Sequence, residues 1–165
     1  MKNPRLAREL VAEIEAFLSE MKSLMLAVPN EQAAIASYAP FVVLNDRFYI
    51  LVSELAQHTK ALRETSLASV LIIEDESQSA SIFARRRLQY EVSVQGIPVA
   101  SETHTQASSA MLKRHGDVVA QLLQLSDFHM FELRPENGRF VKGFGRAYEL
   151  APKSLVSDQL DHLRR

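Results

Sequence analysis

The sequence contains no cysteine, and that absence alone removes several kinds of chemistry. Disulfide bonds, thiolate metal sites and a cysteine nucleophile are all excluded. The formal net charge is −1, so bulk charge gives no reason to expect binding to nucleic acid or to an anionic membrane. No apolar run is long enough to cross a bilayer, and the N-terminus lacks the uninterrupted apolar stretch of a signal peptide. We therefore expect a cytoplasmic protein with no nucleic-acid or membrane partner.

The familiar catalytic and nucleotide-binding motifs are missing as well. There is no G-x-S-x-G, no P-loop, no G-x-G-x-x-G and no H-E-x-x-H. His104 and His115 do not have the i, i+4 spacing of paired metal ligands on a helix. The acids at 74–76 have no further oxygen ligands at a defined spacing, which favours a solvated loop over a cation site. Motifs alone therefore identify no reaction.

The length and composition fit a single domain with a substantial core. The chain has 165 residues, of which 47% are hydrophobic and 24% charged. No linker divides it, so we expect one domain over 1–165. Apolar residues recurring at three- and four-residue steps predict an amphipathic helix over 1–22, with Asn3 as its N-cap. Further helices are predicted over 54–63 and 105–125.

Alternating apolar residues predict that most of the remaining chain forms strands. Turns are predicted at Asn45-Asp46 and at 135–138, and Pro40 indicates an edge or a bulge. A C-terminal tail over 151–165 is predicted to add one or two helical turns. The fold class that follows is mainly β with α (α+β), an antiparallel barrel-like sheet with helices packed outside. The predicted strands lie at 24–28, 33–44, 47–53, 68–73, 88–94, 128–133 and 140–148.

The last predicted strand carries two glycines. Gly143 and Gly145 share one face of it with small residues, while Phe140 and Phe144 share the other face. Paired glycines on one face indicate a bend or the close approach of another group. The pattern does not distinguish a kinked barrel strand from contact with a helix, a partner subunit or a flat ligand.

Two polar patterns are candidates for a binding site. Ser53 precedes the predicted helix at 54–63 as a candidate N-cap, and His58 and Lys60 lie within about one turn of each other on it. Such a junction can hold a phosphate or carboxylate, although a capped connector with solvated polar residues is the commoner arrangement. Arg87 ends the only basic cluster and falls on the polar face of its strand. It is either a solvated edge residue or a partner for carboxylates.

Six segments, taken in order, carry a family resemblance: SYAPF at 37–41, SELAQHTKAL at 53–62, IEDE at 73–76, FARRRL at 83–88, LSDF at 125–128 and FVKGFGRAY at 140–148. Together they cover nearly the whole chain. The set resembles the HugZ/HutZ haem-utilisation family, within the FMN-binding split-barrel (pyridoxamine-phosphate-oxidase-like) superfamily. The resemblance implies a homodimer of split β-barrels with ligand sites at the subunit interface.

The resemblance also implies haem binding and, as in the best-known members, oxidative haem breakdown. A dimeric scaffold or haem carrier without catalysis is the alternative. A porphyrin needs an apolar slot, cations for its two propionates, and an axial histidine tuned by a neighbouring group. By resemblance, Arg87 and Asp127 are the candidate catalytic residues. Arg87 matches a position near the haem, and Asp127 matches the acid that hydrogen-bonds the axial histidine. His58 matches a family histidine close to the site.

The C-terminal sequence departs from the family pattern. Haem-binding members carry their axial histidine in a Gly-His-Arg motif, which this chain lacks, and His162 is the histidine nearest that place. Either His162 ligates the haem iron, or haem binds in another manner. The superfamily offers FMN as the alternative ligand, because Ser53, His58 and Lys60 resemble the residues that hold its phosphate.

Overall fold

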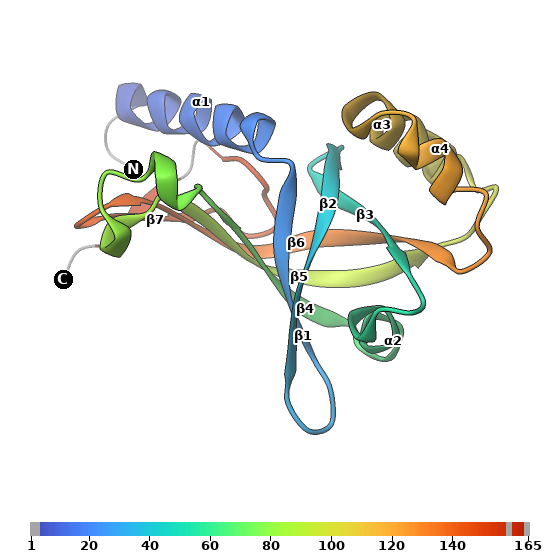
Figure 1. Cartoon of the computed structure of the whole chain (residues 1–165). Coiled ribbons are helices and arrows are strands. Elements are labelled where there is room, and N and C mark those ends of the chain that lie inside the picture. The colour runs from blue at the N-terminus through green and yellow to red at the C-terminus, as the bar shows by residue number, and fades with distance from the viewer. Residues whose placement is uncertain (1–3, 158–159, 164–165) are drawn as a thin grey trace.

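The strands of the chain form one antiparallel sheet that closes into a barrel. The computed structural model describes residues 4–157 and 160–163. The strand order is β3-β2-β1-β4-β5-β6-β7-β8, and pairing of β3 with β6 closes the barrel (Figure 1). The predicted split-barrel class is confirmed. The strands are β1 (Ser23–Pro29), β2 (Ala34–Leu44), β3 (Arg47–Ser53), β4 (Leu67–Ile73), β5 (Arg87–Ile97), β6 (Phe128–Gly143), β7 (Arg146–Leu150) and β8 (Leu160–His162).

Proline at position 40 marks the place where β2 changes partner. Residues 34–40 pair with β1, whereas residues 41–44 pair with β3. Proline has no N–H to donate to the ladder, so it suits a point where pairing on one side ends. The hairpin that follows is as predicted, since Asn45 and Asp46 both have positive φ (50° and 59°).

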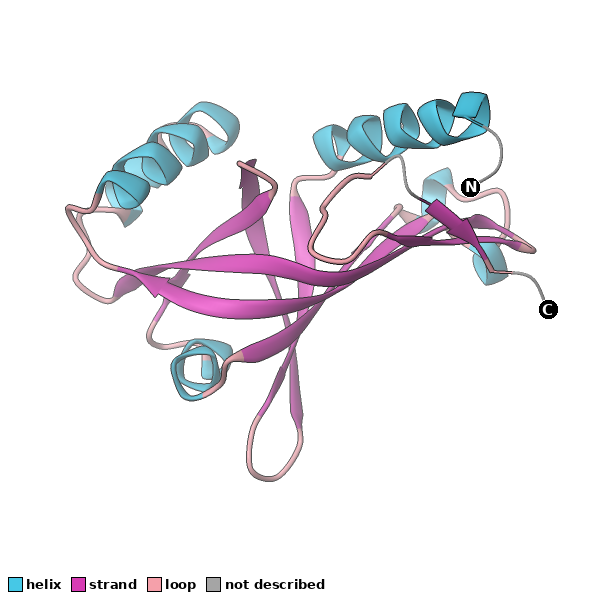
Figure 2. Ribbon diagram, turned by 180° about the vertical axis from the view of Figure 1, so that it is seen from behind, coloured by secondary structure: helices cyan, strands magenta, loops and turns pink. Residues whose placement is uncertain are grey.

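The helices lie outside the barrel, as predicted. In Figures 1 and 2, α1 and α3 lie on one side of the sheet and α2 on the other. Leu10, Ile14 and Phe17 of α1 join the main core inside the barrel. A second core joins α3 and α4 to β2, β3 and β6. The helices are α1 (Pro4–Glu20), α2 (Gln57–Glu64), α3 (Glu102–His115) and α4 (Val118–Leu122), with short 3₁₀ helices at Glu76–Gln78 and Ile82–Ala84.

The predicted helix over 105–125 is two helices. Ser101 caps α3 by accepting a hydrogen bond from the His104 N–H at 3.1 Å, so the helix starts earlier than predicted. Gly116 ends it with a φ of +85°, a value that favours glycine. Within the described ranges, no helix is long and apolar enough to cross a membrane. The predicted N-cap Asn3 lies outside those ranges.

The prediction of a hairpin at 135–138 is wrong, because the long strand β6 runs through this segment. β6 continues through this segment and pairs with β5 along its length. Pro135 lies where the β5–β6 register shifts, so a bulge accommodates the missing N–H. Gly138 pairs with Tyr90, and a Cβ at 138 would lie 2.7 Å from the Tyr90 ring. The glycine therefore serves a close approach within the sheet and not a turn.

The strand predicted over 140–148 is in fact a turn between two strands. β6 ends at Gly143 and β7 begins at Arg146, and Gly145 between them has a φ of +65°. Phe144 consequently lies in the turn with 72% of its surface exposed, whereas Phe140 is fully buried. The glycine pair makes the bend that the sequence indicated, but the bend is a full reversal of the chain.

The C-terminal tail adds a strand in place of the predicted helical turns. β8 pairs with β7 in antiparallel register. Leu155, in the segment that leads to β8, is buried, and its carbonyl accepts a hydrogen bond from the Tyr90 hydroxyl at 2.7 Å.

Candidate functional site

Ser53 and Asp127 meet where β3 ends and β6 begins. The Ser53 hydroxyl donates to Oδ2 of Asp127 at 2.8 Å, and the Glu54 N–H donates to the Asp127 carbonyl at 2.7 Å. The Glu54 carboxylate also bonds to Arg63 and to Nε2 of His129, the latter at 2.7 Å. The hydrogen bond from Arg63, followed by that from His129, lowers the pKa of Glu54. We refer to these five residues as the acidic junction.

The prediction that Ser53 caps a helix is wrong. α2 begins at Gln57 with Ala56 as its N-cap, and no side chain caps it. The Ser53 hydroxyl accepts from the Leu55 N–H at 3.2 Å and donates to Asp127. Pairing of β3 with β6 brings this carboxylate within reach of the serine, and a charged acceptor attracts a hydroxyl more strongly than a backbone group does.

His58 is buried between α2 and the sheet, with 8% of its surface exposed. Its Nδ1 lies 2.6 Å from the Ser37 hydroxyl, and its Nε2 is buried with no hydrogen-bond partner. Burial lowers the pKa of His58, so the ring is neutral at neutral pH. Ser37 lines an open groove on the sheet. His58 is therefore connected to that groove through a hydroxyl.

Lys60 lies apart from Ser53. It lines a groove of about 540 Å³ between α2 and the hairpin that joins β1 to β2, beside Glu31 and Glu64. Ser53 does not line this groove. The structure therefore does not bring Ser53 and Lys60 together in one cavity.

Arg87 lines a cavity of about 280 Å³ at the C-terminal end of β6. We call this cavity the arginine cavity. Its lining includes the side chains of Arg139 and Arg146 as well, together with Phe83 and Phe144, and none of the described residues that line it is acidic. Of the predicted basic cluster only Arg87 lines this cavity, because Arg85 and Arg86 bond to Glu74.

Sequence reasoning missed Arg139 and Arg146 as members of this cavity. The signal lay in the alternation along β6, which puts Arg139, Val141 and Gly143 on one face. That signal was hidden by the hairpin predicted at 135–138, which cut the strand in two. Arg146 enters the cavity from β7, after the glycine turn.

His162 lies beside the arginine cavity. Its Nε2 is 3.0 Å from the carbonyl of Gly145, a residue of the cavity lining, and its ring lies 5.1 Å from the Tyr148 ring. Because a carbonyl only accepts, Nε2 carries the proton and Nδ1 keeps the lone pair needed by a metal ligand. No group of three potential metal-ligating side chains occurs in the described part of the chain.

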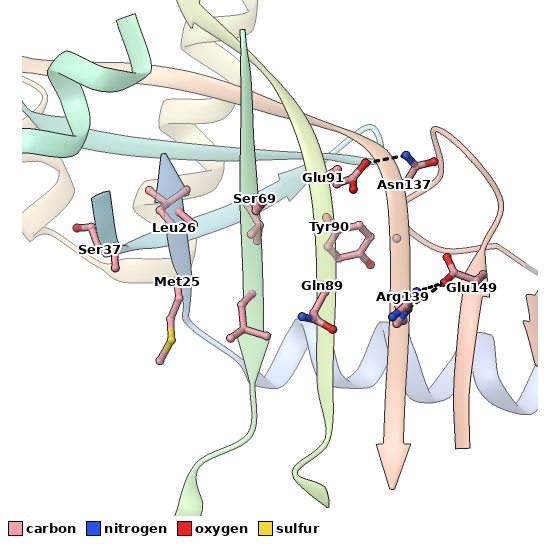
Figure 3. A pocket seen from close by; sticks show the side chains of 15 residues that line it. Met25, Leu26, Ser37, Ser69, Gln89, Tyr90, Glu91, Asn137, Arg139 and Glu149 are labelled. Carbon is pink, nitrogen blue, oxygen red and sulfur yellow. Dashed lines mark hydrogen bonds and ion pairs between the residues drawn. The ribbon is translucent and has the colours of Figure 1, made fainter. Parts of the chain in front are cut away.

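A groove of about 580 Å³ crosses the outer face of β1, β4, β5 and β6. Figure 3 shows Met25 and Leu26 on β1, Ser69 on β4 and Gln89 on β5. Arg139 is bonded to Glu149 and Asn137 to Glu91. Gln89 and Arg139 line both this groove and the arginine cavity. The two depressions therefore share a border.

Comparison with known proteins fits this architecture. A family model described as pyridoxamine 5′-phosphate oxidase matches residues 10–142. Haem oxygenase HutZ of Vibrio cholerae is 38% identical over 157 residues, which cover 94% of this chain and 89% of that protein. The chain belongs to the pyridoxamine 5′-phosphate oxidase family. Its resemblance to the HutZ group, expected from the sequence, is confirmed.

Solved structures of this family superpose closely on the chain. The crystal structure of HutZ, described as a haem storage protein from Vibrio cholerae, gives a TM-score of 0.77 at 38% identity and covers 81% of this chain and 95% of that one. Campylobacter jejuni ChuZ gives a TM-score of 0.80 at 28% identity, over 96% of this chain and 66% of that one.

The residues predicted to hold the phosphate of FMN, the alternative ligand in this family, do not fit that group. Ser53 gives its hydroxyl to the Asp127 carboxylate, and Lys60 lies beside two further acids, Glu31 and Glu64. A phosphate at either place would approach carboxylates, which repel it. This arrangement does not favour FMN.

The two candidate catalytic residues lie far apart within one chain. Arg87 pairs with Val141 near the end of β6, whereas Asp127 directly precedes Phe128 at its start. The intervening strand corresponds to roughly 40 Å at the usual rise per residue. Figure 1 shows β6 running from the α4 side of the molecule to the β7 side. One chain therefore does not bring Arg87 and Asp127 to a common ligand.

Proposed function

We propose that this protein binds haem at a site shared by two chains and acts in haem utilisation, with oxidative haem breakdown as its reaction. The observation that carries the proposal is the arginine cavity, where the described lining residues include three arginines and two phenylalanines and no acid. This lining suits the two propionates and the apolar ring of a porphyrin. The family relationship to HutZ supports the same choice of ligand.

A homodimer follows from the separation of Arg87 and Asp127. If a haem needs both residues, the second must come from another copy of the chain. The open groove on the outer sheet face supplies a surface for that copy, since Met25 and Leu67 on this face are about half exposed. The arginine cavity borders this groove and would lie at the edge of the dimer interface.

Each residue then has a stated role towards haem. Haem iron would supply the binding and reduction of dioxygen. Arg87 would place its charge beside a propionate or over the open side of the iron. Asp127 of the partner subunit would replace the Gly145 carbonyl as the acceptor of the Nε2–H of the axial histidine, and would raise the basicity of that ring. His162 is the candidate axial ligand through Nδ1. Neutral His58 would hold the Ser37 hydroxyl in place at the dimer interface.

A parallel titration with haemin and FMN tests the choice of ligand. We expect a Soret band with haemin and unchanged FMN fluorescence. Arg87→Ala should weaken haemin binding roughly tenfold, since a charge-assisted bond is lost. Arg8→Ala, at an exposed arginine on α1, is the matched control and should bind as the wild type does. Absence of a Soret band with stoichiometric haemin would refute haem binding.

Mixing two defective variants tests whether the site is shared. In a dimer of Arg87→Ala with Asp127→Ala, one shared site has both native residues and the other has neither. Since half of randomly mixed dimers are of this kind, about a quarter of the wild-type sites should return. If both residues served a site within one chain, mixing would restore none.

Incubation of the haemin complex with ascorbate and oxygen separates an enzyme from a carrier. We expect the Soret band to decay and a biliverdin-like absorbance to appear. A stable Soret band would leave the protein as a haem carrier.

A further inference from the structure

Within the described part of the chain, one arginine of the arginine cavity has a charge that the fold does not use. Arg139 donates from Nε and Nη2 to Glu149, and Arg87 donates from Nη1 to the carbonyl of Arg85 at 3.1 Å. Among the described residues, none forms an ion pair or hydrogen bond with the side chain of Arg146. Arg146 is therefore free to pair with an anion that enters the cavity.

The backbone beside Arg146 leaves room for its guanidinium. A Cβ at Gly143 would lie 3.1 Å from Nη2 of Arg146, closer than such contacts normally are. The glycine turn thus lets the guanidinium lie against the backbone at the cavity. Because none of the cavity-lining residues that the structure describes carries a carboxylate, the charges of Arg87 and Arg146 add.

Two phenylalanines of the lining are mostly exposed. Phe83 has 85% of its surface exposed and Phe144 has 72%. Exposed phenyl rings beside the unpaired guanidinium of Arg146 suit a ligand that is both apolar and anionic, because each part of the ligand meets its preferred partner. A planar molecule with carboxylate substituents has this chemistry.

We infer that Arg146 binds a carboxylate of the ligand while Phe83 and Phe144 contact its apolar part. This inference rests on the proposed function, and for haem the carboxylate is a propionate. Arg87 and Arg146 then have different tasks. Arg87 bonds to a backbone carbonyl and provides a fixed positive charge. Arg146 instead forms an ion pair with the carboxylate at the edge of the porphyrin ring.

The test compares haemin with detergent-dispersed haemin dimethyl ester, which lacks the two carboxylates. Arg146→Ala should weaken haemin binding roughly tenfold and leave ester binding unchanged. Arg146→Lys keeps the charge without the planar fork and should recover part of the affinity for haemin. Phe144→Ala should weaken both ligands to a similar extent. Arg8→Ala is the control for loss of a surface arginine.

Each result decides between the two proposals. If the wild type binds haemin and Arg146→Ala binds it equally well, the role of Arg146 is refuted while haem binding stands. A loss of both ligands in Arg146→Ala likewise refutes a carboxylate-specific role, and thermal melting shows whether the variant is folded. If the wild type binds no haemin, the proposed function fails and this inference fails with it.

Discussion

The acidic junction and the arginine cavity lie at opposite ends of β6, and their polar groups are used differently. At the junction, Asp127 and Glu54 have partners within the chain, and the bonds tie the end of β3 to the start of β6. At the cavity, no described residue bonds to the side chain of Arg146, and Arg87 bonds to a backbone carbonyl. The junction groups therefore support the fold, including Asp127, which is also proposed to act at the haem, whereas the charge of Arg146 is left for a ligand.

Glu132, on the junction half of β6, provides the strongest test of that difference. It is 2% exposed, and it accepts hydrogen bonds from Tyr49, Arg134 and, at 3.2 Å, Arg47. Burial raises the pKa of Glu132, but these bonds outweigh burial and leave the pKa below 4.5. Burial also raises the pKa of Tyr49 to about 12, so it remains a donor.

Replacing Glu132 with Ala should therefore lower the free energy of unfolding by about 2–3 kcal/mol, because three donors lose their acceptor. Urea denaturation measures the change, and Glu132→Gln, which keeps the volume and one acceptor, should cost less. An Ala variant within about 0.5 kcal/mol of the wild type would show that the junction half is not organised for stability.

A smaller effect is expected from pH at His58. Burial lowers its folded-state pKa below 6.5, so the unfolded chain takes up the proton at a higher pH than the folded chain does. The stability contribution is complete above about pH 6.5 and is lost as the pH falls through the window below that value. His58→Gln should flatten this decline in urea denaturation measured at several pH values. An unchanged slope would contradict the prediction.

The smallest effect is expected at the cavity end. Arg139 and Glu149 form an exposed pair, with 50% and 37% of their side chains accessible. Arg139→Ala should change the free energy of unfolding by only about 0–0.5 kcal/mol, because exposed pairs are screened by solvent. Thermal melting checks this. A loss above about 1 kcal/mol would mean that the cavity charges also support the fold.

The sequence predicted the barrel well because its strands carry their own signals. Alternation in β5 and the Asn45-Asp46 hairpin depend on nearest neighbours, and both are confirmed. Gly138 and Gly145 were harder to interpret. The same residue type serves a close approach to Tyr90 in one place and a chain reversal in the other. Only the pairing partner distinguishes these uses.

The candidate site was predicted less well, because its members meet through long-range pairing. The local sequence predicts that Ser53 caps a helix. In the fold, Asp127 lies beside it and accepts its hydroxyl hydrogen bond. Arg139 and Arg146 are separated from Arg87 by more than fifty residues, and no local spacing connects them. Whether Ser53, His58, Lys60, Arg87, Asp127 and His162 bind a ligand stays a prediction for the titrations above.

The lack of a Cβ at Gly138 affects the C-terminal segment of the chain. It admits the ring of Tyr90, whose hydroxyl reaches across the core to the carbonyl of Leu155. Leu155 belongs to the segment that delivers β8, and with it His162, to the edge of the sheet. The buried hydrogen bond that holds Leu155, shortly before the strand of the candidate iron ligand, therefore depends on a glycine opposite Tyr90.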